Sequence, residues 1–414
     1  MSQLINWRKE SNNSKINKLV LFIISPFMAM LYSLKSINTR SSFVIIFLFS
    51  ICFGMAFTVT NIRDERKSEA SIDGVSYRVN FEQYCITSDV EYYSGLDDFL
   101  SFSGENKDYY FDTVAFYVSK ITHNYHVMFF VLSIVFVFFQ LKCLKYFVLN
   151  DSFKISFACM LLLYLFTWNQ IVNINGVRFW TAAWIGVYCI FKIFYENKDR
   201  FLLLTLITPF FHGSFWIFIA LMLAAKLFAR YEKLWIALFI LSIITSNVLI
   251  EVMQGYTGYI PSFLENSIAY YTDEFYINKL NSAGTGLWWM DKLFNILRKS
   301  YINILVIILI LNRNKISLDK NETKLYRFLL VLVTFANFGM SIPTLGNRFI
   351  ILSYSIIAFL WLTFFKGEKY NWVIYLFPVA FFMSIYHQFN LYNLVTDGLF
   401  YISSPFILIP QYLF

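Results

Sequence analysis

Charged residues are scarce in this 414-residue chain, in which Asp, Glu, Lys and Arg together make up 14% of the sequence. A typical soluble domain contains about 25%. Hydrophobic residues make up 58% of the chain and aromatic residues 21%. Apolar stretches of about 20 residues, the length that a helix needs to cross a bilayer, recur along the whole chain. The sequence therefore predicts an all-α, polytopic integral membrane protein.

Several other patterns are missing. The apolar stretches lack the alternation with polar residues that is typical of an outer-membrane barrel. The five cysteines are scattered, and only Cys85 lies outside an apolar stretch, so we expect no disulfide framework. No Walker, dinucleotide-binding, zinc-protease or Asp-x-Asp motif occurs. We therefore expect no metal and no cofactor, and the net charge of +8 requires no nucleic-acid partner.

Short segments rich in Lys and Arg separate most of the apolar stretches, and about 10–12 transmembrane helices are expected within a single domain over residues 1–414. Two long polar segments, 61–124 and 252–299, interrupt this pattern. The stretch 18–34 contains a proline and is expected to be an interfacial or re-entrant helix. The candidate spans are 18–34, 42–60, 125–148, 153–173, 177–195, 201–211 with 213–229, 232–251, 300–312, 326–341, 347–365 and 371–388, followed by a last apolar stretch at 398–414.

The distribution of charge orients the chain, because cytoplasmic loops of membrane proteins are rich in Lys and Arg. Six segments contain 22 of the 34 Lys and Arg residues but only 8 of the 26 Asp and Glu residues. Placing them in the cytoplasm puts both long polar segments outside, together with Arg178, His212 and Arg348. The six segments are 1–41, 139–156, 192–200, 226–233, 312–327 and 366–369.

Arg178 and His212 stand at junctions between apolar stretches. A charged side chain at mid-bilayer costs roughly 2.5–3.5 kcal/mol on insertion scales, so such a residue usually serves a function. The guanidinium of Arg178 suits phosphate oxygens, and Gly176 would let the backbone approach a ligand. The alternative is an interfacial arginine that extends to lipid headgroups.

The imidazole of His212 suits a general base, because its ordinary pKa of about 6.5 lies near neutral pH. The alternative is a structural histidine bonded at a helix end. Two polar neighbours, Ser214 beside His212 and Asn175 beside Gly176, are candidate substrate contacts. A cation and an imidazole together indicate an anionic substrate and a proton transfer.

Arg348 follows Asn347 at another expected helix start, where the asparagine is a candidate cap or substrate contact. Arg178 and Arg348 together would hold a diphosphate. In the outer segments, Glu82 lies in an acidic stretch that would orient sugar hydroxyls or simply be solvated. A Tyr- and Trp-rich stretch that includes Trp288 and Trp289 would stack on sugars or form an interfacial belt.

The order of these motifs resembles the EpsG/Wzy-type polysaccharide polymerases over roughly residues 75–365. Two positions depart from the family pattern: Phe179 stands where the family often has Gln, and Ser76-Tyr77 stands where it has Asp-Tyr. The matching motifs are Gly176-Val177-Arg178 with Thr181-Ala182-Ala183, the charged turn Glu196-Asn197-Lys198-Asp199-Arg200, Phe211-His212-Gly213-Ser214, and Asn347-Arg348.

The resemblance implies a metal-independent glycosyltransferase in the bacterial cytoplasmic (inner) membrane, with its active site facing the periplasm or exterior. Such enzymes join undecaprenyl-diphosphate-linked oligosaccharide repeat units into O-antigen, capsule or exopolysaccharide. The implied partners are the lipid-linked donor and acceptor, membrane lipid and, as a further candidate, a chain-length regulator. Arg178, Arg348 and Gly176 would then bind the diphosphate, while His212 would activate the acceptor hydroxyl.

Three other functions stay open at this point. A flippase for lipid-linked oligosaccharides would also bind a diphosphate, although its charges should continue through the bilayer and its halves should repeat. An O-antigen ligase would perform nearly the same chemistry on a finished glycan. A membrane O-acyltransferase would use a histidine but would not need two arginines.

Overall fold

The computed structural model describes residues 7–58, 73–103, 106–245, 273, 288–315 and 319–413. The described residues are 81% helical and contain no strand. The all-α, polytopic membrane fold that the composition predicted is therefore confirmed.

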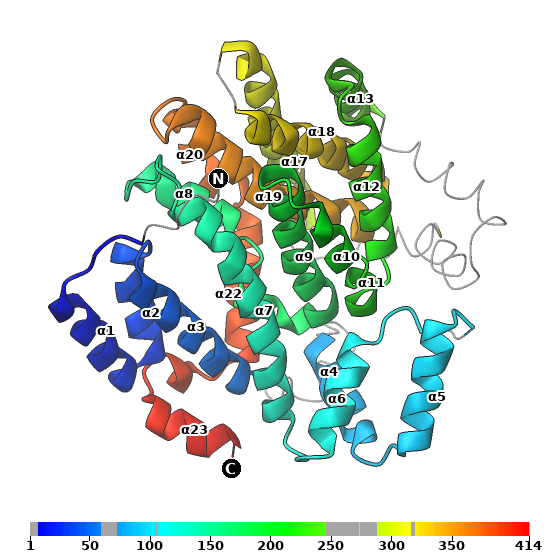
Figure 1. Ribbon diagram of the computed structural model, residues 1–414. Helices are drawn as coiled ribbons and strands as arrows, with labels where there is room; N and C mark the ends of the chain where they lie inside the picture. Colours follow the sequence, from blue (N-terminus) through cyan, green and yellow to red (C-terminus); the bar gives the residue numbers. More distant parts are fainter. Residues whose placement is uncertain are drawn as a thin grey trace.

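The helices form one bundle with a smaller group of helices at one end (Figure 1). Side chains cap several N-termini, as where Ser88 accepts a hydrogen bond from the Glu91 amide at the start of α5. The helices are α1 (Asn12–Ile24), α2 (Pro26–Ser33), α3 (Arg40–Met55), α4 (Asp73–Tyr84), α5 (Asp89–Leu100), α6 (Tyr110–Ser119), α7 (Tyr125–Val148), α8 (Phe157–Phe166), α9 (Val177–Ile190), α10 (Leu202–Thr205), α11 (Thr208–Phe211), α12 (Phe215–Phe228), α13 (Glu232–Ile244), α17 (Trp288–Asn312), α18 (Lys320–Phe338), α19 (Pro343–Phe365), α20 (Asn371–Tyr375), α21 (Phe377–Ala380), α22 (Phe382–Val395) and α23 (Pro405–Leu413).

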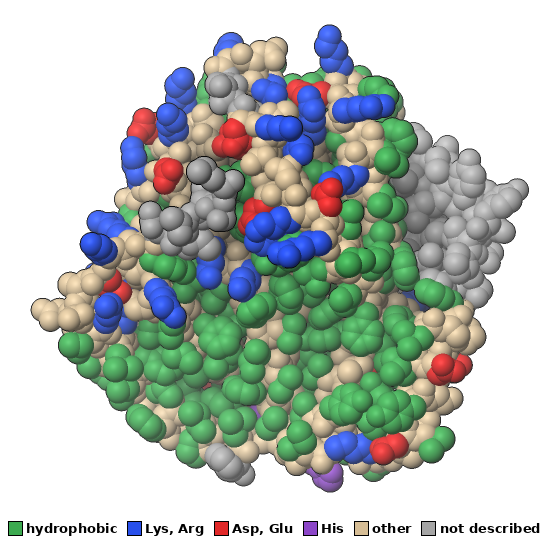
Figure 2. All heavy atoms as spheres, viewed as in Figure 1, with side chains coloured by type: hydrophobic (Ala, Val, Ile, Leu, Met, Phe, Trp, Pro, Cys, Tyr) green, Lys and Arg blue, Asp and Glu red, His purple; other side chains and the backbone are tan. Residues whose placement is uncertain are grey.

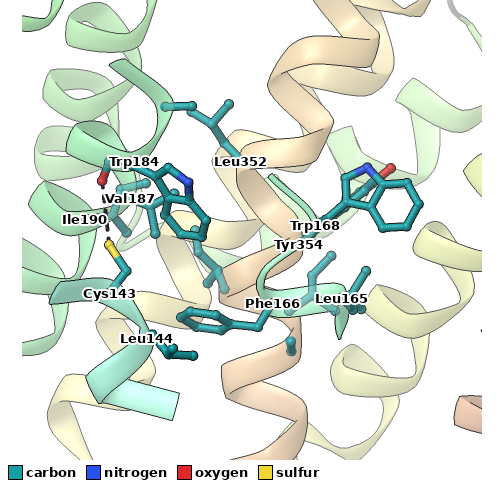
Figure 3. Close-up of a cluster of buried hydrophobic side chains, with 14 of the residues drawn as sticks. Cys143, Leu144, Leu165, Phe166, Trp168, Trp184, Val187, Ile190, Leu352 and Tyr354 are labelled. Atoms are coloured by element: carbon teal, nitrogen blue, oxygen red, sulfur yellow. Dashed lines mark hydrogen bonds between the residues drawn. The ribbon is translucent and has the colours of Figure 1, made fainter. Parts of the chain in front are cut away.

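Helices α9 and α19 lie in the middle of the bundle, with α7 and α18 packed beside them (Figure 1). Large side chains from different helices meet there, including Trp184 of α9, Phe166 of α8 and Leu352 of α19 (Figure 3). The buried indole of Trp184 donates a hydrogen bond to the Asn169 carbonyl over 3.0 Å, as a buried Trp N–H requires. Because Asn169 precedes α9 in the chain, this bond joins the segment before α9 to the middle of that helix.

Four helical segments are long and apolar enough to cross a membrane: 125–148, 157–195, 289–315 and 344–365. A fifth is formed if α20, α21 and α22 count as one span, which bends by 54° between Ala380 and Phe382. These are fewer than the 10–12 helices expected, because other apolar stretches form shorter or interrupted helices within the described residues. Proline removes a backbone donor and interrupts helices, and it lies at or beside such interruptions in 18–34 and 201–211.

The stretch 18–34 is divided into α1 and α2 by Ser25, the residue before Pro26. Neither helix is long enough to cross a bilayer. Lys18 of α1 is buried, and its ammonium donates to Glu10 at 2.5 Å and to Ser42 of α3 at 2.7 Å. These contacts tie α1 to the beginning of the first long helix of the bundle.

Helices α4, α5 and α6, which we call the cap, come from the first long polar segment. They lie at one end of the bundle, near the beginning of α9 and the end of α11 (Figure 1). Lys and Arg side chains gather at the opposite end, and a broad hydrophobic surface lies between the two ends (Figure 2). Helix α6 buries one face, which includes Phe111, Ala115 and Val118. Most of the second polar segment, 252–299, lies outside the described residues.

Candidate functional site

Arg178 is the second residue of α9, directly after the 3₁₀ helix Ile171–Gly176. Its Nη1 donates to Asp108 Oδ1 at 3.0 Å, and its Nε donates to Tyr77 Oη at 3.3 Å. The Arg178 side chain remains 43% exposed, whereas that of Asp108 is 4% exposed. Because a guanidinium has five N–H donors, Arg178 keeps donors for a further ligand.

Asp108 joins the cap to the bundle. Burial raises the pKa of its carboxyl to about 6, against the opposing effect of Arg178 and of the Gly213 amide, which donates to it. The neighbouring Tyr109 amide donates to the Phe210 carbonyl at 2.9 Å. Gly213 is required here, since a Cβ at this position would lie 2.7 Å from the Lys107 carbonyl oxygen.

His212 lies in the turn between α11 and α12. Its Nδ1 accepts a hydrogen bond from the Ser214 amide at 3.2 Å and lies 2.8 Å from the Ser214 hydroxyl. A backbone amide can only donate, so in the neutral imidazole the proton is on Nε2. Ser214 therefore orients His212, and the free ring nitrogen is a donor. The sequence suggested that His212 acts as a general base. That role stays a prediction, and the hydrogen bond at Nδ1 does not favour it.

Arg348 lies in the first turns of α19 and is half-buried. Within the described part of the chain, its guanidinium has no hydrogen-bonding or ion-pair partner. Its Cζ lies 5.2 Å from the centre of the Phe179 ring, and the His212 ring packs edge-on against the same ring at 5.3 Å. Phe179, which stands where the family often has Gln, thus contacts both the Arg348 guanidinium and the His212 ring.

Asp73 begins α4 and is exposed to solvent. Desolvation raises the pKa of its carboxyl, and the positive charges of Arg348 and Arg178 oppose that shift. The side-chain oxygen of Asn175 accepts a hydrogen bond from the Gly74 amide at 3.0 Å. Asn175 therefore holds the start of α4, and with it Asp73, beside the two arginines.

The structure brings Arg178, His212 and Arg348 together, as the sequence suggested, and adds Asp73, Asp108 and Tyr77. Sequence reasoning missed these three because acidic and aromatic residues of a polar segment look like solvated surface. One signal was available: Asp108 directly precedes the apolar helical pattern of α6. The cluster of these six residues is called the arginine site below.

The other predicted contacts lie elsewhere. Asn347 Oδ1 is 3.5 Å from Arg298 Nη2. Glu82 is exposed and pairs with Arg78 of the same helix at 3.1 Å. Trp289 is 54% exposed on α17, and Trp288 begins that helix, but its side chain lies outside the described residues.

The arginine site combines two guanidiniums, two carboxylates and an imidazole N–H. Guanidiniums bind phosphate oxygens through paired hydrogen bonds, and an exposed carboxylate such as Asp73 can accept a proton. Among the described residues, no group of three or more His, Cys, Asp or Glu side chains is placed to hold a metal ion. The chemistry available to these side chains is therefore anion binding combined with proton transfer.

Comparison with known proteins identifies the family of this chain. The model of the EpsG family matches residues 64–402, which include the cap and every residue of the arginine site. No curated protein and no solved structure matches the chain. The match covers most of the sequence, and the function that it implies is that of a glycosyltransferase-like polysaccharide polymerase. This multi-pass membrane protein therefore belongs to the EpsG family.

Proposed function

We propose that this protein polymerises undecaprenyl-diphosphate-linked oligosaccharide repeat units into a surface polysaccharide (O-antigen, capsule or exopolysaccharide). The reaction takes place at the outer leaflet of the bacterial cytoplasmic membrane, with the arginine site facing the periplasm or exterior. The growing glycan on its lipid diphosphate is the donor, and a hydroxyl of a fresh lipid-linked unit is the acceptor.

The observation that carries this proposal is the convergence of Arg178 and Arg348 at one end of an apolar bundle. Arg178 is held by Asp108 yet is 43% exposed, and Arg348 has no hydrogen-bonding partner within the described residues. A lipid diphosphate is an anion that must be bound at the surface of a membrane, and two guanidiniums neutralise it without a metal.

The reaction exchanges one bond for another. The bond between the anomeric carbon and the diphosphate oxygen breaks, and the diphosphate leaves with both electrons on its lipid. The acceptor oxygen forms the new glycosidic bond and gives its proton to a base. Charge that develops on the leaving oxygen is stabilised by donors already in place, which is the largest catalytic effect in many enzymes.

The roles of the remaining residues follow from their hydrogen bonds. The carboxylate of Asp108 is buried and already binds Arg178 and the Gly213 amide, so it positions Arg178. Asp73 is the exposed carboxylate of the site, and we assign it as the base for the acceptor hydroxyl. With Nδ1 bound to Ser214, His212 donates through Nε2 to an oxygen of the diphosphate.

The test is the length of the surface glycan in cells that lack this protein and carry a wild-type or variant copy. Wild type should restore a ladder of repeat units, and Arg178→Ala should collapse it to a single repeat. Arg178→Lys should also fail, because an ammonium lacks the planar donor fork. Arg230→Ala, at an exposed arginine beyond the end of α12 that is opposite to His212, is the matched control and should restore the ladder.

The same assay separates the other functions. If no repeat unit reaches the surface of the deletion strain, the protein would be a flippase and not a polymerase. A full ladder that fails to be transferred to its final lipid would indicate a ligase, and a full ladder that lacks only an acyl substituent would indicate an acyltransferase. Insensitivity of the purified enzyme to a chelator would support metal independence.

A further inference from the structure

The three cap helices line an open cavity of about 600 Å³, apart from the arginine site. Its volume lies within the range of about 300–1,000 Å³ that is typical of small-molecule sites. Tyr84 of α4, Tyr92 of α5 and Tyr109 before α6 contribute to its walls, together with polar side chains that include Asn80 and Gln83. Each of the three cap elements therefore contributes to the wall of the cavity.

The aromatic walls are held in fixed orientations. Tyr92 stacks on Phe116 with ring centres 3.9 Å apart and planes 2° from parallel. Tyr109 Oη donates to the Tyr92 carbonyl at 2.9 Å, and a Cβ on Gly95 would lie 2.6 Å from that hydroxyl oxygen. A cavity whose walls are already ordered loses little conformational entropy when a ligand binds.

The polar lining suits a ligand rich in hydroxyl groups. Tyr84 Oη donates to Asp112 Oδ1 at 2.6 Å, and a carboxylate has about four acceptor positions, so Asp112 can accept further hydrogen bonds. The amides of Asn80 and Gln83 offer both donors and acceptors. No Lys or Arg is among the residues that line this cavity, so its chemistry disfavours phosphate and favours a neutral saccharide.

The cavity and the arginine site are neighbours in the chain, because adjacent residues belong to them. Tyr109 of the cavity wall follows Asp108, which pairs with Arg178. Burial raises the pKa of the Asp112 carboxyl, and the hydrogen bond from Tyr84 and the positive charge of Arg178 oppose that shift. A glycan whose diphosphate lies at Arg178 is therefore within reach of the cap.

We propose that the cap cavity is a saccharide subsite that binds sugar units of the lipid-linked glycan while the arginine site binds its diphosphate. This inference rests on the proposed function for the identity of the glycan. The saccharide belongs either to the growing chain or to the incoming repeat unit, and its neutral, hydroxyl-rich chemistry is the same in both cases.

The experiment measures binding of phosphate-free oligosaccharides to the purified full-length protein. The probes are a single repeat and a multi-repeat fragment, released by mild acid from the surface polysaccharide of the source bacterium. Gln83→Trp adds a bulky ring at an exposed position that lines the cavity, and Val90→Trp adds the same ring at an exposed position that does not. We expect Gln83→Trp to weaken binding by at least about ten-fold, while Val90→Trp binds as wild type does.

Asp112→Asn, which keeps the size of the side chain, should also weaken binding. Tighter binding of the multi-repeat fragment would identify the growing chain, and equal binding would identify a single unit. Absence of saturable binding, or equal affinity of the two Trp variants, would overturn the subsite. Arg178→Ala should still bind the phosphate-free probes, so the subsite can stand even if the ladder assay rejects polymerisation.

Discussion

Arg178 has two kinds of partner in the described structure. One part of its guanidinium is held by Asp108 and Tyr77, and the rest is accessible. Fixing a long side chain before the ligand arrives reduces the entropy lost on binding. This arrangement explains why a buried carboxylate lies beside a group whose proposed ligand is an anion.

The role of His212 can be separated from that of a base by two substitutions. His212→Gln keeps an N–H donor, whereas His212→Ala removes both ring nitrogens. If His212 donates through Nε2, the Gln variant should retain substantially more polymerisation than the Ala variant, which we expect to lose about 10²-fold or more. The rate of glycan synthesis by the purified proteins measures the difference. An equal loss of activity in both variants would support a general base at His212 in place of a donor.

Asp108 should make stability depend on pH. Because burial raises the pKa of Asp108 to about 6, its contribution to the free energy of unfolding is fully present below its ordinary pKa of about 4 and is lost as pH rises through 6. Asp108→Asn, which resembles the protonated acid, should therefore gain stability relative to wild type between pH 4 and 7, by at most about 1.4 kcal/mol per pH unit.

Thermal unfolding in detergent across this pH range tests the prediction for Asp108. Asp97→Asn, at an exposed acid of α5, is the matched control and should change the wild-type pH dependence little. Identical pH dependence of wild type and Asp108→Asn would contradict the assignment of a raised pKa to Asp108.

At the scale of elements, the site depends on how closely the cap approaches the turn between α11 and α12. The Tyr109 amide bonds the Phe210 carbonyl, and the rings of Tyr110 and Phe211 lie 4.1 Å apart. These contacts join segments about a hundred residues apart in the chain. They place Asp108 and His212 on either side of Gly213.

Gly213→Ala should disturb this contact. Its Cβ would lie 2.7 Å from the Lys107 carbonyl oxygen, and overpacking of this kind costs about 1–3 kcal/mol. We expect a lower melting temperature and shorter glycans, because Asp108 moves with Lys107. Gly398→Ala is the control, since no atom lies within 4 Å of a Cβ there. Equal melting temperatures for the two variants would show that the Lys107 backbone does not pack tightly against Gly213.

At the scale of the whole molecule, charge separates the two ends of the bundle. Lys and Arg gather at one end (Figure 2), and the cap and arginine site lie toward the other. Since cytoplasmic surfaces of membrane proteins are rich in Lys and Arg, this separation supports an orientation with the cap outside. The lipid-linked substrates of the proposed reaction are reached from that side.

The five cysteines provide a test of this orientation. Cys85 lies at the end of α4 in the cap and is partly exposed, whereas the other four are buried. A membrane-impermeant maleimide should therefore label intact spheroplasts through Cys85, and Cys85→Ser should abolish the labelling. Burial raises the pKa of the Cys85 thiol, so labelling should be faster at alkaline pH. Labelling only after the membrane is permeabilised would place the cap in the cytoplasm.

The sequence by itself determined the class of the molecule, because long apolar stretches can satisfy their backbone in a bilayer only as helices. It also made Arg178, His212 and Arg348 candidate site residues, since ionisable groups among apolar residues are conspicuous. Within the described residues, four or five segments are long enough to span a membrane. Hydropathy records apolar character but not where prolines and short turns interrupt a helix.

Only the tertiary structure decided which polar residues of the cap belong to the site. Asp108 is 70 residues from Arg178 in the chain, and Asp73 is still farther away. Their sequence surroundings are those of solvated acids, and packing of the cap against the turn at Gly213 gives them arginine neighbours. The orientation of His212 was likewise decided by its bond to the Ser214 amide, because the position of a ring proton depends on local geometry and not on residue type.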